Sequence, residues 1–161
     1  MMNMVSRLFA RSEPVLSEAG PRDAATIAAV HAVSFQRGWS EDEIERLLTN
    51  RSVIAHRTTN RRTLTGFILS RMAAGEAEIL SVAVAPARRG KGLARSLLNH
   101  HLRRLAGLGT RAVFLEVGRD NAPALSLYRR AGFKEVGQRP GYYQHDKKGA
   151  VAALVLRRDL I

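Results

Sequence analysis

Residues 88–98, Arg-Arg-Gly-Lys-Gly-Leu-Ala-Arg-Ser-Leu-Leu, place four cations and two glycines directly before an apolar run with helical spacing. The first N–H groups of a helix have no acceptors within the helix, so a helix start attracts anions. Glycines let a ligand approach the backbone closely, and arginine and lysine add positive charge around it. A single phosphate would not need so many cations, so this segment predicts a site for a diphosphate together with a further phosphate.

Two common phosphate-binding motifs do not fit this segment. The P-loop requires Gly-Lys followed by Ser or Thr, but Gly92 follows Gly90-Lys91. The dinucleotide fingerprint requires a third Gly or Ala and an acidic residue about 20 positions further on. Counted from Gly90, the third position is Arg95, and the next acidic residue, Glu116, belongs to the next expected strand. Both motifs are therefore excluded.

Two residues further along the chain are candidates for proton transfer. Glu116 interrupts an apolar strand, and the cost of burying its charge would make it a suitable general base near pH 7. The alternative for Glu116 is a salt bridge to one of the many arginines. Tyr128 lies two turns into a helix that Asn121 is expected to cap, and its hydroxyl could protonate a leaving thiolate. The alternative for Tyr128 is a core tyrosine packed against Leu125.

The hydrophobic pattern predicts the elements that position these residues. We expect strands at 15–19, 52–57, 63–71, 77–85, 111–117, 133–138 and 151–156. We expect helices at 23–35, 40–48, 94–105 and 121–131. Residues 58–62 are expected to be the loop of a hairpin. The order is β-α-α-β-β-β-α-β-α-β-β, a mixed α/β (α+β) fold with a meander first and βαβ units after it.

Composition and charge limit the function classes. The 161 residues include no cysteine, which excludes a disulfide framework and fits a reducing compartment, and the five histidines show no metal-binding spacing. No apolar run approaches the roughly 20 residues that span a bilayer. We therefore expect a cytoplasmic protein without a metal or membrane contact, with a frayed tail over 1–12 and one domain over 13–161. Its oligomeric state cannot be predicted.

The net charge of +12 is unevenly distributed along the chain. Residues 1–85 carry ten Lys or Arg and nine Asp or Glu, whereas residues 86–161 carry 16 and five. Such a basic half attracts phosphates, so an RNA-binding or ribosome-binding module is an alternative function. A solvated basic surface without a partner explains the charge equally well.

Residues 89–94, Arg-Gly-Lys-Gly-Leu-Ala, resemble the Arg/Gln-x-x-Gly-x-Gly/Ala signature of the GNAT superfamily of N-acetyltransferases. The resemblance implies a GNAT fold, with a mostly antiparallel sheet of about seven strands and helices on both faces. It also implies that acetyl-CoA is a cosubstrate whose diphosphate binds the backbone amides of this loop. Residues 81–84 resemble the splayed fourth strand, which pairs with the pantetheine arm. The implied cofactor-binding residues are Val82, Ala83, Val84, Arg89, Gly90, Lys91, Gly92, Leu93, Ala94, Arg95, Asn121 and Tyr128.

Three later segments most resemble the ribosomal-protein-alanine N-acetyltransferases within this superfamily: Leu-Glu-Val at 115–117, Asn-x-x-Ala-x-x-Leu-Tyr at 121–128 and Arg-x-x-Tyr-Tyr at 139–143. Those enzymes act on the N-terminal amine of a small ribosomal subunit protein. The resemblance implies that Glu116 is the base and Tyr128 the acid. It implies that Tyr142 and Tyr143 line the peptide site, although they could equally cover the sheet edge. Trp39 resembles the tryptophan of a Pro-Trp-Ser segment that forms another wall.

The acceptor is left open by the sequence. An α-amine, with a pKa near 7.7–8.0, is already about a tenth neutral at pH 7, whereas a lysine side chain with a pKa near 10.4 is almost fully charged. One glutamate therefore suffices most easily for a protein N-terminus. A lysine side chain or a small-molecule amine is the alternative acceptor.

Overall fold

The computed structural model describes residues 13–140 and 152–161. The tail over 1–12, Tyr142, Tyr143 and the first residue of the strand expected at 151–156 lie outside the described residues. Four α-helices and two short 3-10 turns accompany a seven-stranded sheet in the described part of the chain. The strands are β1 (Val15–Glu18), β2 (Val53–Asn60), β3 (Thr63–Ala73), β4 (Glu76–Val84), β5 (Ala112–Gly118), β6 (Lys134–Arg139) and β7 (Ala153–Asp159). The helical elements are η1 (Pro21–Asp23), α2 (Ala24–Ser34), α3 (Glu41–Thr49), η2 (Pro86–Arg88), α4 (Leu93–Gly107) and α5 (Ala122–Arg130).

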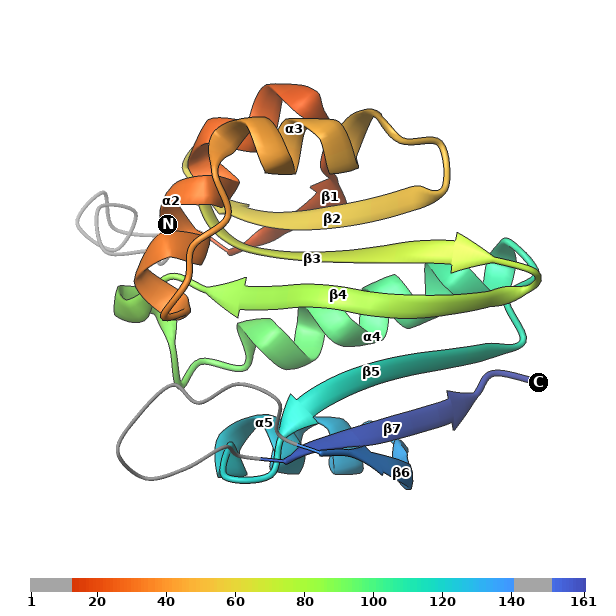
Figure 1. Ribbon diagram of the computed structural model, residues 1–161. Coiled ribbons are helices and arrows are strands. Elements are labelled where there is room, and N and C mark those ends of the chain that lie inside the picture. Colours follow the sequence, from red (N-terminus) through yellow and green to blue (C-terminus); the bar gives the residue numbers. More distant parts are fainter. Residues whose placement is uncertain (1–12, 141–151) are drawn as a thin grey trace, which may run out of the picture.

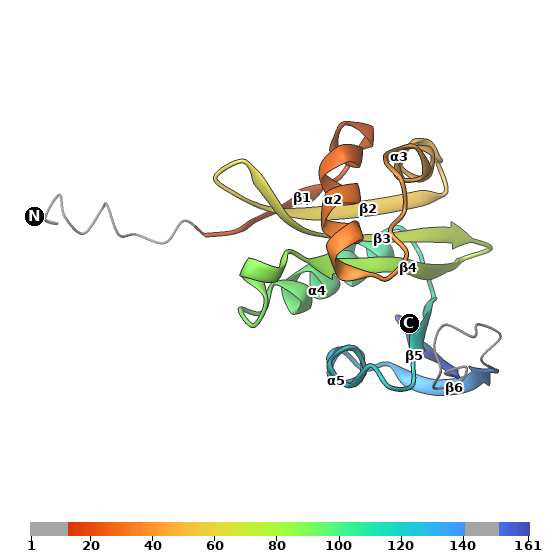
Figure 2. The same ribbon diagram turned by 60° about the vertical axis from the view of Figure 1, so that its left-hand side comes forward.

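This element order confirms the order expected from the sequence. The sheet runs β1-β2-β3-β4-β5-β7-β6, and every neighbouring pair is antiparallel except β4 and β5. Helices α2 and α3 pack against one face of the N-terminal half, and α4 crosses the opposite face (Figures 1 and 2). The helices on both faces explain why β3 is buried along most of its length. No helix among residues 13–140 and 152–161 is long and apolar enough to cross a membrane.

The capping box and the apolar stripe predicted from the sequence are both present in the helices. The Ser40 hydroxyl accepts a hydrogen bond from the Glu43 N–H at 3.1 Å, and Glu43 Oε2 accepts one from the Ser40 N–H at 2.7 Å. This reciprocal pair is the expected capping box at the start of α3. Helix α4 buries one stripe at helical spacing against the sheet: Leu93, Leu97, Leu98, His101, Leu102 and Leu105.

The loop expected over 58–62 is shorter than predicted. Thr58 and Asn60 pair with β3, so only Arg61 and Arg62 form the turn. Both arginines have positive φ, 47° and 68°, as a two-residue turn between twisted antiparallel strands requires. Such turns favour Asn-Gly, so two arginines give no sequence signal for a tight hairpin.

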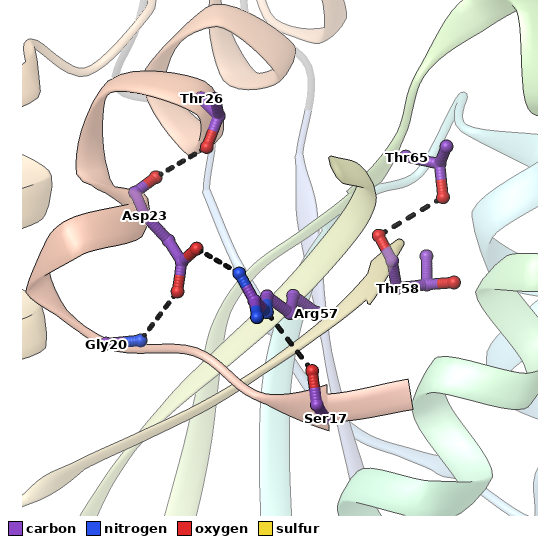
Figure 3. A network of polar contacts seen from close by, with 7 residues as sticks. All are labelled: Ser17, Gly20, Asp23, Thr26, Arg57, Thr58 and Thr65. Atoms are coloured by element: carbon purple, nitrogen blue, oxygen red, sulfur yellow. Dashed lines mark hydrogen bonds and ion pairs between the residues drawn. The ribbon is translucent and has the colours of Figure 1, made fainter. Parts of the chain in front are cut away.

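A polar network ties the first strand to the rest of the sheet (Figure 3). The Asp23 carboxylate forms an ion pair with Arg57 and accepts a hydrogen bond from the Gly20 N–H at 2.9 Å. Arg57 Nε donates to Ser17 Oγ on β1 at 3.1 Å. Asp23 is 5% exposed, so the network joins β1, η1 and β2 around a charge that is almost out of contact with water.

Loss of the Asp23 carboxylate should be costly. Asp23→Ala leaves the Arg57 guanidinium partly buried without its counter-charge, and should lower the free energy of unfolding by about 2–4 kcal/mol in urea denaturation. The control is Asp159→Ala, which removes an exposed pair with Arg157 and should cost under about 1 kcal/mol. Equal losses in the two variants would contradict this assignment.

Two histidines fasten α4 to the sheet. His101 on α4 and His56 on β2 place their Nδ1 atoms 2.7 Å apart, and His101 Nε2 lies 2.6 Å from Ser70 Oγ on β3. Burial, with the neighbouring His56 and His100 as further causes, lowers the pKa of His101 to about 3. Burial, with His100 and Arg104 as further causes, lowers the pKa of His56 to about 4. Both rings are therefore neutral in the folded protein at pH 7.

This pair should make stability fall in mild acid. The unfolded chain binds protons at its histidines near pH 6.5, whereas the folded pair does not until about pH 4 and 3. The free energy of unfolding should therefore fall as pH drops below 6.5, by up to about 1.4 kcal/mol per pH unit per histidine. Urea denaturation at pH 7.5, 6.0 and 5.0 measures this slope. His101→Gln should reduce it, whereas His100→Gln keeps the buried pair and should retain it; an unchanged slope in His101→Gln would refute the assignment.

Candidate active site

A cleft opens where β4 and β5 separate. These parallel strands pair only from Glu76–Ala112 to Glu78–Phe114, and beyond that point they diverge (Figure 1). The resulting cleft has a volume of about 1020 Å³. Its lining includes most of the residues singled out from the sequence: Val82, Ala83, Val84, Arg89, Gly90, Gly92, Leu93, Ala94, Arg95, Glu116, Asn121 and Tyr128.

The edge of β4 that faces this cleft is not paired with β5 beyond Glu78. On its other edge, β4 pairs with β3 as far as Val84, with a bulge at Leu80 because Ser70 pairs with Ile79 and Leu69 with Ser81. Ser81 lines the cleft and is buried, yet its hydroxyl has no hydrogen-bond partner among the described residues. A buried polar atom without a partner is costly, so this edge is suited to an elongated ligand with amide groups.

The loop before α4 is shaped for close approach of an anion. Gly90 and Gly92 have φ values of +76° and +78°, and the space where a Cβ would lie is open at both positions. The Ser96 N–H donates to the Gly92 carbonyl at 3.0 Å, so the N–H groups of residues 93–95 lie in the first turn, where no intrahelical acceptor exists. The loop therefore combines accessible backbone with the positive end of a 15-residue helix.

Several basic side chains lie near this loop, but they do not all line the same pocket. Arg88, Arg89, Arg95 and Arg130 line the cleft, whereas Glu116 is the only acidic residue in the lining from the described part of the chain. Lys91, expected to contact the same ligand, instead lines a neighbouring pocket of about 460 Å³. The charge of the cleft favours a ligand with several negative charges.

The Arg89 side chain carries a positive charge and also links structural elements through hydrogen bonds. Its Nε donates to the Val84 carbonyl at the end of β4 at 3.0 Å, and its Nη2 donates to Ser34 Oγ at the end of α2 at 3.1 Å. The side chain therefore joins the glycine loop to α2. Its contact with a cofactor stays a prediction.

Glu116 is exposed, contrary to the expectation that its strand buries it. Leu115 and Val117 point into the core beneath α4 and α5, so Glu116 faces the opposite side of β5. Its side chain is 35% exposed, and its Oε1 lies 3.1 Å from Arg139 Nη2 at the end of β6. The salt-bridge alternative is therefore present, and it leaves the carboxylate in the cleft. Ala112 and Phe114, which lie on the same face of β5 as Glu116, are apolar, so the sequence gives no clear signal for this exposure.

Tyr128 packs in the core and also lines the cleft, and Asn121 caps α5 and lines the same cleft, whereas their roles toward a ligand stay predictions. The Tyr128 ring packs edge-on against Phe133 with centroids 5.7 Å apart, and burial raises the pKa of its hydroxyl to about 12. The hydroxyl is therefore protonated at neutral pH, in a residue that also lines the cleft. Asn121 Oδ1 accepts a hydrogen bond from the Ala124 N–H at 3.3 Å, which confirms the expected cap of α5.

The wall near α2 differs from the expectation for Trp39. Trp39 is not among the residues that line the cleft; its ring stacks on His31 with centroids 4.6 Å apart. Ser34 and Phe35 line the cleft instead, and the Phe35 side chain remains exposed. The sequence predicts both residues only as the end of a helix, so their position in the cleft wall has no local signal. The expected contacts of Tyr142 and Tyr143 lie outside the described residues.

The chain is similar to known acetyltransferases. A model of the acetyltransferase (GNAT) family matches residues 23–133. The chain is 36% identical over 159 residues to an uncharacterized protein of Mycobacterium leprae, covering 93% of this chain and 42% of that protein. It therefore spans less than half the length of that relative. It is 32% identical over 105 residues to the [ribosomal protein bS18]-alanine N-acetyltransferase of Escherichia coli, covering 65% of this chain and 70% of that enzyme.

The fold has a close counterpart among solved structures. The crystal structure of the ribosomal-protein-S18-alanine N-acetyltransferase from Escherichia coli superposes with a TM-score of 0.85 over 92% of this chain and 94% of that one. The two sequences are 24% identical over this superposition, so the match concerns the fold.

The two ends of α4 offer a test of the glycine loop. Gly92→Ala places a side chain at φ +78° and should lower the free energy of unfolding by about 1 kcal/mol. The added methyl enters open space at the cleft and should also weaken coenzyme A binding by about tenfold in calorimetric titration. Gly107→Ala, at the far end of the same helix and without a positive φ, is the control and should change neither quantity unfavourably. Equal coenzyme A affinity in both variants would contradict the role of the loop.

Proposed function

The chain belongs to the GNAT family of acetyltransferases, and on that premise we propose that it transfers the acetyl group of acetyl-CoA to the N-terminal α-amine of a protein. The observation that supports this most strongly is the cleft itself. One continuous space joins the glycine loop, the unpaired edge of β4 and the Glu116 carboxylate. An anionic cofactor and an amine can therefore meet in it.

The residues of the cleft fit acetyl-CoA. The first-turn N–H groups of α4, the two glycines and the surrounding arginines suit the diphosphate and the additional phosphate. The unpaired edge of β4 and the unpartnered Ser81 hydroxyl suit the amides of the pantetheine arm. Backbone N–H groups over 82–84 would then polarise the thioester carbonyl.

The proposed reaction is a direct transfer. The neutral amine nitrogen attacks the thioester carbonyl carbon, the C–N bond forms, and the C–S bond breaks without a covalent enzyme intermediate. Glu116 accepts the proton that the amine loses, and its ion pair with Arg139 orients the carboxylate. The protonated hydroxyl of Tyr128 supplies a proton to the departing thiolate.

An α-amine is the acceptor that best suits this site. Glu116 is exposed rather than buried, so it is best matched to an acceptor that is already partly neutral near pH 7. An N-terminal amine meets that condition, whereas a lysine side chain does not. The Escherichia coli relative is named as an N-acetyltransferase for alanine of ribosomal protein bS18, which supports a ribosomal protein as the acceptor. The basic half of the chain would favour a location beside ribosomal RNA.

Removal of the Glu116 carboxylate should greatly lower kcat without weakening the binding of acetyl-CoA. Glu116→Gln should lower kcat by at least about 100-fold, because proton transfer is lost while the shape of the site is kept. The affinity for acetyl-CoA, measured by calorimetry, should remain within about twofold. Glu135→Gln is the matched control: it removes an exposed carboxylate on β6 and should leave kcat unchanged. Near-full activity of Glu116→Gln would show that another group is the base.

The acceptor is identified with a panel in the same assay. It contains peptides with Ala, Ser, Gly and Met N-termini, an N-terminally blocked lysine peptide and an aminoglycoside. Preference for the free N-termini supports the proposal, and preference for the lysine peptide or the aminoglycoside refutes it. RNA titrations at two salt concentrations test the basic surface separately, since binding through phosphates falls steeply with salt.

A further inference from the structure

His31 takes no part in the proton transfers proposed above, yet it contacts the cleft wall near α2. It lies in the last turns of α2 and is only 3% exposed. Its ring stacks on Trp39 with an interplanar angle of 17°, and its centroid lies 4.4 Å from that of Phe35. Beneath it, the ring of Phe67 on β3 lies 6.3 Å away. One buried imidazole therefore packs between the sheet and both aromatic residues of the segment that follows α2.

The same imidazole makes a hydrogen bond that depends on its protonation. The Trp39 main-chain N–H donates to His31 Nδ1 at 3.1 Å. Nδ1 can accept this bond only while it carries no proton. Burial lowers the pKa of His31, although the nearby Glu43 opposes this, so the ring is neutral at pH 7. His31 is therefore a hydrogen-bond acceptor for a backbone group eight residues ahead of it.

This bond ties Trp39, the residue that precedes the cap of α3, back to the preceding helix. Residues 35–40 join α2 to α3 without regular structure. At the first end, the Phe35 N–H donates to the His31 carbonyl at 3.1 Å. At the other end, Ser40 belongs to the capping box of α3. Between these ends, Gly38 lies close to Ala32 of α2, and the side-chain hydrogen bond and the ring contacts of the connection with α2 converge on His31, beside which Phe35 lines the cleft.

We propose that His31 is a positioning residue that fixes residues 35–40 as the acceptor wall of the cleft, by accepting the Trp39 N–H and stacking on Trp39 and Phe35. The part of this proposal that concerns the acceptor rests on the proposed function. Trp39, which lies outside the cleft lining, then acts through its backbone and its stacking rather than by contacting the acceptor. Phe35 is the side chain that this arrangement holds in the wall of the cleft.

Two variants separate the hydrogen bond from the ring. His31→Phe keeps an aromatic ring for stacking but offers no acceptor, whereas His31→Asn offers an oxygen close to the position of Nδ1. Loss of the bond in His31→Phe should raise KM for the acceptor peptide by about tenfold, and His31→Asn should recover part of this loss. Acetyl-CoA affinity should be unchanged in both variants. Val33→Ala, at an exposed position of the same helix, is the control and should leave all of these values unchanged.

Fluorescence gives a readout that needs no activity, because Trp39 is the only tryptophan in the chain. Acrylamide should quench Trp39 more strongly in His31→Phe than in the wild-type protein, since the connection is no longer held in place. Equal quenching, or an unchanged KM for the acceptor, would overturn the positioning role. An equal loss of acceptor and acetyl-CoA binding would overturn it as well, because it would indicate general destabilisation.

The two proposals can fail separately. If the wild-type protein acetylates no amine of the panel, the proposed function fails, and quenching of Trp39 alone decides whether His31 positions the connection. If the panel confirms the activity and the quenching and KM of His31→Phe match those of the wild type, only the inference about His31 fails.

Discussion

The early end of the pairing between β4 and β5 is the constraint on which the rest of the structure depends. Two parallel strands that share one sheet stay together for three residue pairs and then diverge, while β3 continues to hold β4 on its other edge. An unpaired strand edge inside a fold leaves backbone donors and acceptors without partners, which is costly unless something else binds them. The helix α4, which connects the two strands, begins at the wide end of the gap, so its unpaired N–H groups join those of β4. A ligand with amides and phosphates is suited to this combination of strand edge and helix start.

Polar side chains link the elements around the cleft through hydrogen bonds and an ion pair. Arg89 connects the glycine loop to β4 and α2, and Arg139 connects β6 to Glu116 on β5 across the intervening β7. On the far side of the sheet, His101 holds α4 through His56 and Ser70. Each of these side chains joins elements that are distant in sequence. The positions of the two walls of the cleft therefore depend on side chains that carry a charge or a titratable ring.

The sequence predicted what depends on local physical chemistry and missed what depends on distant contacts. The cap residues Ser40 and Asn121 and the apolar stripe of α4 could be predicted because their partners lie within one or two helical turns. The glycine loop could be predicted because its chemistry resides in adjacent residues. The exposure of Glu116 was not predicted because its apolar neighbours Leu115 and Val117 indicate a mostly buried strand, whereas Glu116 lies on the face of β5 opposite to these two core residues. The partnership with Arg139 and the cleft position of Phe35 depend on tertiary contacts, which no local pattern encodes.

The placement of β7 in the interior of the sheet affects the order in which the protein can fold. β7 follows every other strand in the chain, yet it lies between β5 and β6 and pairs with β5 along its full length. β1 to β4, with α2 and α3, form a contiguous unit of antiparallel neighbours that a growing chain can complete early. β5, with only three pairs to β4, cannot be held firmly until β7 docks beside it. The wall that carries Glu116 is therefore completed only when β7 docks, and the core cluster beneath it, which includes Leu154 and Leu156 of β7, is completed in the same step.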